Sequence, residues 1–110
     1  MPLSKPHRLV KKRDFDLVFK NGKSFRGAFI ALKIVPSGNR VSRFGFVIPA
    51  RIIKTAVARN RIRRILSETV KTHRIYNHPG LDGVVMVLRS PSLDPGVLRG
   101  DLRDVLGKFS

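Results

Sequence analysis

The feature that most constrains this chain is the stretch 55–71, TAVARNRIRRILSETVK, in which apolar and cationic residues separate with helical periodicity. At 100° per residue, one side follows the i, i+3, i+4, i+7 spacing of a buried stripe. That side carries Thr55, Ala58, Ile62, Ile65, Leu66, Thr69 and Val70. The rest of the circumference carries Arg59, Asn60, Arg61, Arg63, Arg64, Ser67 and Lys71. The fold must therefore cover one side of this helix with a core and leave a cationic side open.

The cations of this helix stand next to one another, and no acid precedes Glu68. Adjacent like charges lower the intrinsic stability of a helix, so an anionic partner is expected to offset their repulsion. The whole chain has a formal net charge of +16 and a pI near 11.8, which produces a strong positive field. Residues 17–67 hold 12 basic residues and no acid. This polarised charge is typical of a nucleic-acid-binding protein.

The length of 110 residues and the 42% apolar content predict a single RNA-binding domain over 1–110. No apolar run approaches the ~20 residues that span a bilayer, and the first residues lack the apolar stretch of a secretory signal. We therefore expect a cytoplasmic protein with no membrane partner. Residues 1–12, basic and with prolines at Pro2 and Pro6, are expected to form a flexible arm. That arm is either a disordered tail or a segment that follows phosphates.

Local patterns predict the order of helices and strands. A helix over 13–20 ends at Asn21-Gly22, and a last helix begins with Asp94 as its cap and Pro95 at its first position. Strands are expected at 23–26, 28–35, 41–49 and 83–89, with a loop at 73–79. The order helix, three strands, helix, strand, helix predicts an α+β sandwich with helices around a small mixed sheet.

Residues suited to hydrolytic chemistry are scattered. His7, His73 and His78 fall in the predicted tail and loop, away from carboxylates at ligand spacing. The aspartates form no pair typical of a general acid and base or of a two-metal cage. The chain has no cysteine, which excludes disulfides and thiolate metal sites. We therefore expect no metal site, no cofactor bound by the protein alone and no protein active site, so the chain is interpreted as a binding protein.

Two features allow alternative interpretations. Asn60 is either an exposed polar position or a hydrogen-bonding contact to RNA, and its place between two arginines favours the contact. Phe15 and Phe19 are four residues apart on the first helix. Such a pair is more often part of a core than a surface for ligand stacking.

The motif Ala56-Val57-Ala58-Arg59-Asn60-Arg61-Ile62-Arg63-Arg64-Ile65-Leu66 resembles the Arg-Asn-Arg signature of the bacterial ribonuclease P protein component. Three further stretches resemble the same family in the same order. They are 8–22, with Asp14-Phe15 and Val18-Phe19-Lys20-Asn21-Gly22, then Arg43-Phe44-Gly45-Phe46-Val47, then Asp82-Gly83-Val84-Val85. The resemblance covers about 8–91, and its central motif is highly specific.

The resemblance implies an accessory subunit of a ribonucleoprotein endoribonuclease that removes 5′ leaders from precursor tRNA. In such a holoenzyme, RNA is the catalyst, Mg²⁺ is required, and one protein accompanies each RNA. The implied fold is that of ribosomal protein S5 domain 2, with a left-handed β-α-β crossover, an exception to the usual right-handed preference. Residues implied to contact the catalytic RNA are Arg59, Asn60, Arg61, Arg63 and Arg64. The implied cleft for the single-stranded leader includes Phe15, Phe19, Lys12 and Arg13, which favours partly exposed rings that stack on unpaired bases.

One stretch departs from the family pattern. The family often has Ser-Lys-Lys after its Gly-containing strand, whereas this chain has Ile48-Pro49-Ala50-Arg51. Arg51 keeps a cation there and Lys54 supplies a second one nearby, so both are assigned to the RNA contact. Composition alone fits equally well an alternative, a structural rRNA-binding protein of ribosomal type with no role in cleavage. A nuclease that acts without RNA is a third and weaker hypothesis.

Overall fold

A computed structural model describes residues 3, 5–78, 80–89 and 95–109, so the predicted cap Asp94 lies outside the described residues. The elements alternate as the sequence predicts, with two short 3₁₀ helices added. They are η1 (Lys5–His7), α1 (Lys12–Asn21), β1 (Lys23–Arg26), β2 (Ile30–Pro36), β3 (Arg43–Val47), α2 (Ala56–Thr72), η2 (Arg74–Asn77), β4 (Leu81–Val87) and α3 (Pro95–Phe109).

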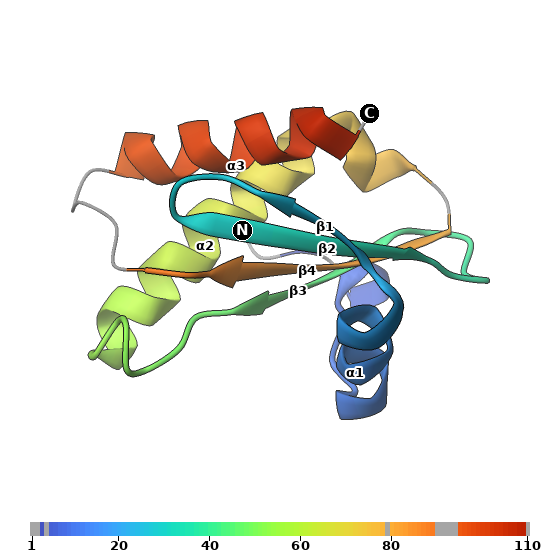
Figure 1. The fold of residues 1–110 in the computed structure, drawn as a ribbon, viewed down its shortest axis with the longest axis horizontal. Coiled ribbons are helices and arrows are strands. Elements are labelled where there is room, and N and C mark those ends of the chain that lie inside the picture. Colours follow the sequence, from blue (N-terminus) through green and yellow to red (C-terminus); the bar gives the residue numbers. More distant parts are fainter. Residues whose placement is uncertain (1–2, 4, 79, 90–94, 110) are drawn as a thin grey trace.

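The four strands form one mixed sheet in the order β1-β2-β4-β3 (Figure 1). β2 pairs antiparallel with both β1 and β4, whereas β3 and β4 are parallel. The parallel pair requires a crossover connection, and α2 supplies it. The predicted α+β class and the mixed sheet are thus confirmed, and β3–α2–β4 is the crossover to which the resemblance assigns the left-handed sense.

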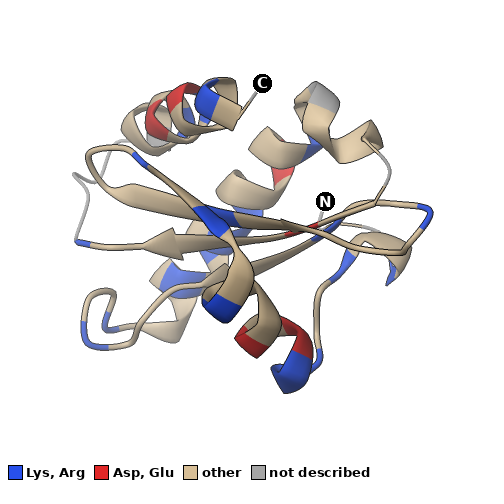
Figure 2. Cartoon of the chain, turned by 45° about the vertical axis from the view of Figure 1, so that its right-hand side comes forward, with Lys and Arg blue, Asp and Glu red and all other residues tan. Residues whose placement is uncertain are grey.

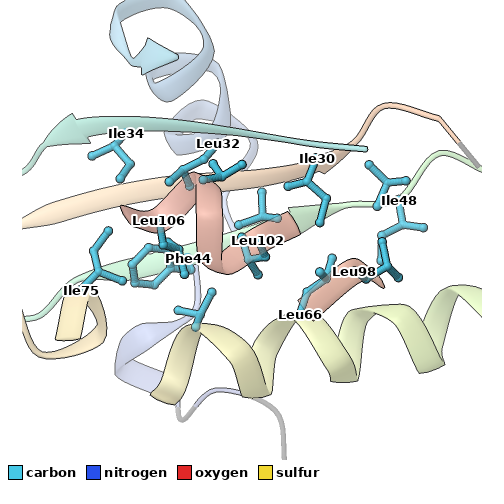
Figure 3. Close-up of a cluster of buried hydrophobic side chains, with 14 of the residues drawn as sticks. Ile30, Leu32, Ile34, Phe44, Ile48, Leu66, Ile75, Leu98, Leu102 and Leu106 are labelled. Atoms are coloured by element: carbon cyan, nitrogen blue, oxygen red, sulfur yellow. The ribbon is translucent and has the colours of Figure 1, made fainter. Parts of the chain in front are cut away.

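The sheet has helices on both faces: α2 and α3 cover one face, and α1 lies on the other (Figure 1). The main core lies under α2 and α3, where side chains from alternate strand positions meet the two helices. Its largest fully buried members include Phe44, Ile30, Leu32, Leu66, Ile75, Leu102 and Leu106, which are labelled in Figure 3. A smaller cluster under α1 is centred on Leu9, Val18 and Val84. The two clusters fix the positions of α1 and α2 on opposite sides of the sheet.

The buried stripe of α2 follows the predicted period. Thr55 caps the helix, since its hydroxyl accepts a hydrogen bond of 3.1 Å from the Ala58 N–H. Leu66 and Val70 are fully buried, and Ile65 and Thr69 nearly so. Ser67 differs from its predicted place on the open side, because it is only 2% exposed. Its small side chain can be buried there because its hydroxyl donates to the Arg63 carbonyl at 2.7 Å.

Described residues of the segment before α1 pack against the sheet, whereas a flexible arm is expected over 1–12, of which residues 1, 2 and 4 lie outside the described residues. Leu3 and Leu9 are buried, and the Leu9 N–H donates to the Phe44 carbonyl at 3.0 Å. Arg8 forms a parallel bridge with Phe44 at the outer edge of β3. His7 Nδ1 lies 2.8 Å from the Ser42 carbonyl, which adds a side-chain contact. The described part of this segment therefore covers the start of an edge strand that would otherwise be open.

β4 begins at Leu81, two residues before the predicted strand, which places Asp82 in the sheet.

One carboxylate ties α3 to the sheet layer. The Asp101 carboxylate of α3 accepts hydrogen bonds from the backbone N–H groups of Ala28, Phe29 and Ile30 at 2.8, 3.0 and 2.9 Å. These bonds hold the loop between β1 and β2 against α3.

Candidate nucleic-acid interface

The open side of α2 presents its cations to solvent. Arg61, Arg63 and Arg64 are exposed, as is Asn60 beside them. Figure 2 shows basic residues on α2 and on the loop before it. The Arg63 guanidinium donates to the Asn60 amide oxygen at 2.9 Å, one turn earlier on the helix. This bond orders two predicted contact residues on one surface, where guanidinium groups can form forked contacts with phosphate oxygens.

Arg59 has a different position from the other arginines of the motif. It is half-buried, and its Nη1 donates to the Ile53 carbonyl at 2.9 Å. Ile53 is buried and belongs to the loop between β3 and α2. Arg59 therefore holds that loop against the start of α2 in addition to contributing charge.

The loop before α2 extends the cationic surface. The N–H groups of Ile52 and Ile53 both donate to the Pro49 carbonyl, at 3.0 and 2.9 Å, which forms a turn. Arg51 and Lys54 are exposed on either side of these two residues. The departure from the family pattern at 48–51 thus leaves two cations beside the helix.

The two phenylalanines of α1 are neither fully exposed nor fully buried. Both rings are half-buried and pack against the small cluster between α1 and the sheet. The Phe15 ring lies directly on Gly45 of β3, where a Cβ atom would overlap it. Lys12 and Arg13, the other predicted leader-binding residues, are exposed at the start of α1, and Lys12 forms an ion pair with Asp16 at 3.4 Å. The half-buried rings therefore leave apolar surface beside exposed cations.

An ion-pair network fixes α1 relative to the sheet. Arg43 of β3 donates two hydrogen bonds to Asp82 of β4, at 2.9 and 2.7 Å, and its Nη1 lies 3.5 Å from Asp14 of α1. The hydrogen bonding to Asp82 raises the pKa of Arg43, burial opposes that rise, and the charges of Asp82 and Asp14 add to it. The forked geometry is the stronger form of this interaction.

A cavity of about 480 Å³ lies between the two candidate surfaces. It is bounded by the segment before α1, by α1, by the outer edge of β3 and by the open side of α2. Its lining consists of Leu3, Arg8, Leu9, Val10, Phe15, Phe44, Gly45, Phe46, Asn60, Arg63, Arg64 and Ser67. Three predicted RNA-contact residues and one predicted leader-binding residue thus meet at a single cavity.

Several of these lining residues have no local sequence signal. Arg8 and Val10 lie in the expected arm, and residues 44–46 are predicted only as part of a strand. They reach the α2 surface through strand pairing and packing, which connect positions far apart in the chain. The family resemblance at 8–22 and 43–47 marks these regions but not the cavity.

The described part of the chain offers neither a metal site nor a membrane span. Within these residues, no group of three or more His, Asp or Glu side chains is placed to hold a metal ion. Across the same residues, no helix is both long enough and apolar enough to cross a membrane.

Comparison with known proteins matches the chain to one family. The family model described as "Ribonuclease P" matches residues 3–110. The ribonuclease P protein component of a Picosynechococcus strain is 34% identical over 87 residues, which are 79% of this chain and 75% of that protein. The component of a Pseudanabaena strain is 33% identical over 109 residues, 96% of this chain and 93% of that protein.

Solved structures of the same kind of protein share the fold. The ribonuclease P protein from Thermotoga maritima superimposes with a TM-score of 0.79 at 27% identity, covering 94% of this chain and 97% of that one. A mutant Staphylococcus aureus ribonuclease P protein gives a TM-score of 0.85 at 23% identity, covering 96% and 89%. The latter likeness shows the fold alone.

Proposed function

This chain belongs to the ribonuclease P protein family, and from that membership we propose that it is the protein subunit of a bacterial ribonuclease P. In this role it binds the catalytic RNA and the 5′ leader of precursor tRNA, and it assists removal of the leader. The observation that supports this most directly is the open side of α2, where Arg61, Arg63 and Arg64 are exposed around Asn60. The ribosomal alternative gains no support from the matched proteins.

In this holoenzyme the RNA subunit and its Mg²⁺ ions cleave the bond, and the protein neutralises charge. Each backbone phosphate that a guanidinium group neutralises releases condensed counterions and reduces repulsion between the catalytic RNA and the precursor tRNA. The protein therefore lowers the Mg²⁺ concentration at which the two RNAs associate. One protein per RNA presents one such surface, in the cytoplasm where precursor tRNA is made.

The α1 side of the sheet is proposed to hold the leader. Half-buried Phe15 and Phe19 offer ring surface for unpaired bases, since base stacking on aromatic side chains tolerates any sequence. Exposed Lys12 and Arg13 stand at the start of the same helix and can neutralise leader phosphates.

Reconstitution tests the proposed function. The chain is combined with a bacterial ribonuclease P RNA at low Mg²⁺, and cleavage of precursor tRNA is compared with that by RNA alone. We expect a clear gain in leader removal. The double variant Arg61→Gln/Arg64→Gln should forfeit much of the gain, because both cations lie on the open side of α2.

A matched control removes the same amount of charge elsewhere. Arg26 on β1 and Arg103 on α3 are both exposed, and neither belongs to α2 or to the loop before it. Arg26→Gln/Arg103→Gln should keep most of the gain. No gain with the unaltered chain would refute the proposed function, and equal reductions in both double variants would show that total charge, rather than the α2 surface, is responsible.

A further inference from the structure

The cavity beside α2 has one apolar wall that the proposed phosphate contacts do not use. Val10 is 72% exposed at this wall, and two half-buried rings flank it, Phe15 from the α1 side of the sheet and Phe46 from the α2 side. Phe15 reaches the wall because Gly45 has no side chain to displace its ring. Aromatic and aliphatic surface is thus accessible within a cavity on a strongly cationic protein.

The opposite wall is polar and positive. Asn60, Arg63 and Arg64 of α2 line it, and Arg8 lies at the segment that closes the cavity. Arg8 is oriented by its own hydrogen bond, since its Nε donates to the Leu3 carbonyl at 2.7 Å. No acid is among the described residues that line the cavity. This combination of charge and apolar surface suits a planar ligand that carries a phosphate.

The outer edge of β3 adds backbone groups to the cavity. β3 is a terminal strand of the sheet, and the Phe44 carbonyl points outward, because it accepts from the Leu9 N–H. Alternate residues of a strand point their backbone groups to the same side. Phe46 comes two residues later in the strand and therefore directs its backbone N–H and C=O toward the cavity. It lies beyond Phe44, the residue whose carbonyl accepts from Leu9. A donor and an acceptor on one residue can bond the edge of a heterocycle.

From these features we infer that the cavity binds one unstacked nucleobase of the RNA that lies on α2, with the phosphate of that nucleotide held by Arg63 and Arg64. This inference rests on the proposed function and names a subsite of it. The volume of about 480 Å³ lies in the range of about 300–1,000 Å³ that small-ligand pockets occupy. The base stacks on the apolar wall, and the backbone N–H and C=O of Phe46 form hydrogen bonds with the polar edge of the base.

The catalytic RNA, rather than the leader, is the source of this base. Four of the lining residues, Asn60, Arg63, Arg64 and Ser67, belong to the helix that is proposed to bind the catalytic RNA. The leader surface formed by Phe19 lies in the cluster between α1 and the sheet, outside the cavity lining. Only Phe15 belongs to both.

The test uses the full chain and two single-tryptophan variants, since the natural sequence has no tryptophan. Val10→Trp places the reporter at the cavity, whereas Val57→Trp places it on α2 outside the lining, at a residue that is 80% exposed. Both changes are at exposed valines, so both variants should fold. Each is titrated with adenosine monophosphate and with ribose 5-phosphate, which lacks the base.

We expect adenosine monophosphate to change the fluorescence of Val10→Trp and to leave Val57→Trp unaffected. Stacking should make its binding roughly 5- to 150-fold tighter than that of ribose 5-phosphate. In the unaltered chain, amide NMR signals of Gly45, Phe46 and Val10 should shift with the nucleotide only. Equal affinity for both probes would overturn the inference, as would equal responses of the two variants.

Competition identifies the source of the base. Prior addition of ribonuclease P RNA should abolish the response of Val10→Trp to adenosine monophosphate, whereas a single-stranded leader oligonucleotide, which shares only Phe15 with the cavity, should reduce it far less. The reverse result would overturn the assignment to the catalytic RNA. The reconstitution experiment above is independent of these titrations, so failure of the subsite and failure of the proposed function give different results.

Discussion

At the scale of single residues, positioning depends on a few side chains whose partners come from distant parts of the chain. Arg43 joins α1 to the sheet through Asp14 and Asp82. Gly45 allows the Phe15 ring to rest on β3. Neither role has a local sequence signature, because each depends on strand register. In the sequence, Arg43 and Gly45 stand out only as part of a stretch that resembles the family.

Removing the carboxylate of Asp82 should destabilise the fold. Asp82→Asn leaves the half-buried Arg43 without its forked partner, and hydrogen bonds to charged groups contribute about 1.5–3 kcal/mol. We expect the free energy of unfolding, measured by urea denaturation, to fall by about 1–3 kcal/mol. The exposed pair of Lys12 and Asp16 provides the control, since Asp16→Asn should change little. A similar small change in both variants would contradict the structural role of Asp82.

The pH dependence of this effect follows from the pKa of Arg43. Folding raises that pKa above its ordinary value, chiefly through the hydrogen bonds to Asp82. A raised pKa gives stability that is fully present below the ordinary value and disappears as the pH rises through the folded one. The destabilisation caused by Asp82→Asn should therefore be the same in neutral and in mildly alkaline buffer. A destabilisation that shrinks between these two buffers would show that another group titrates with the pair.

Adding one methyl group at Gly45 should disturb the leader surface. In Gly45→Ala the new Cβ overlaps the Phe15 ring, which must shift, and such overpacking costs about 1–3 kcal/mol. We expect a lower melting temperature and weaker binding of a single-stranded leader oligonucleotide by fluorescence anisotropy. Gly38→Ala is the control, because nothing lies within 4 Å of a Cβ there. Unchanged leader binding in Gly45→Ala would place the leader away from Phe15.

At the scale of elements, α2 is the most predictable part of the chain and its surroundings are the least. Its stripe and its cap at Thr55 are local patterns, so periodicity identifies them. The packed segment before α1 escapes sequence reasoning because prolines and lysines usually mark a tail, and its bridge to β3 is non-local. The motif groups Arg59 with the other arginines, whereas its bond to Ile53 depends on how the preceding loop folds.

The arginines of α2 should therefore separate into two classes. Arg61→Gln/Arg64→Gln should weaken RNA binding and reduce the slope of log K against log salt by about 0.7–0.9 for each phosphate that is no longer neutralised. Its melting temperature should stay near that of the unaltered chain. Arg59→Gln should weaken binding and also lower the melting temperature, because the loop before α2 is no longer anchored. Filter-retention assays across salt concentrations measure RNA binding, and thermal melts measure stability. Equal melting temperatures of Arg59→Gln and Arg61→Gln/Arg64→Gln would contradict the separation into two classes.

At the scale of the whole molecule, the distribution of acids leaves the cations largely uncompensated. Asp14 and Asp82 form ion pairs with Arg43, and Asp101 accepts hydrogen bonds from backbone N–H groups of the loop between β1 and β2. These three carboxylates, and Asp16 in its pair with Lys12, are engaged within the described part of the chain, and the sequence holds only seven acids against 23 lysines and arginines. The positive field therefore persists over the surface, including the region where α2 and its preceding loop lie together (Figure 2).

Such a net charge should make the isolated protein more stable in salt. A large net charge destabilises a compact state through self-repulsion, and added ions screen exposed charges. We expect the melting temperature to rise by a few degrees between dilute buffer and about 0.15 M salt, where the Debye length falls to ~8 Å. The melting temperature in an uncharged osmolyte at equal osmolality is the control, because such an osmolyte is excluded from the protein surface but does not screen charges. A melting temperature that falls with salt would indicate that internal ion pairs outweigh the self-repulsion.

The packing of Leu3 in the core and of Leu9 against β3 has a practical consequence for anyone who shortens the protein. A chain that starts at Lys11 would lack Leu3 and Leu9 in its interior and would uncover the outward carbonyl of Phe44. An uncovered strand of this kind is a template for a second molecule. Such a truncated chain would tend to self-associate through β3, at the very place where the base is proposed to enter.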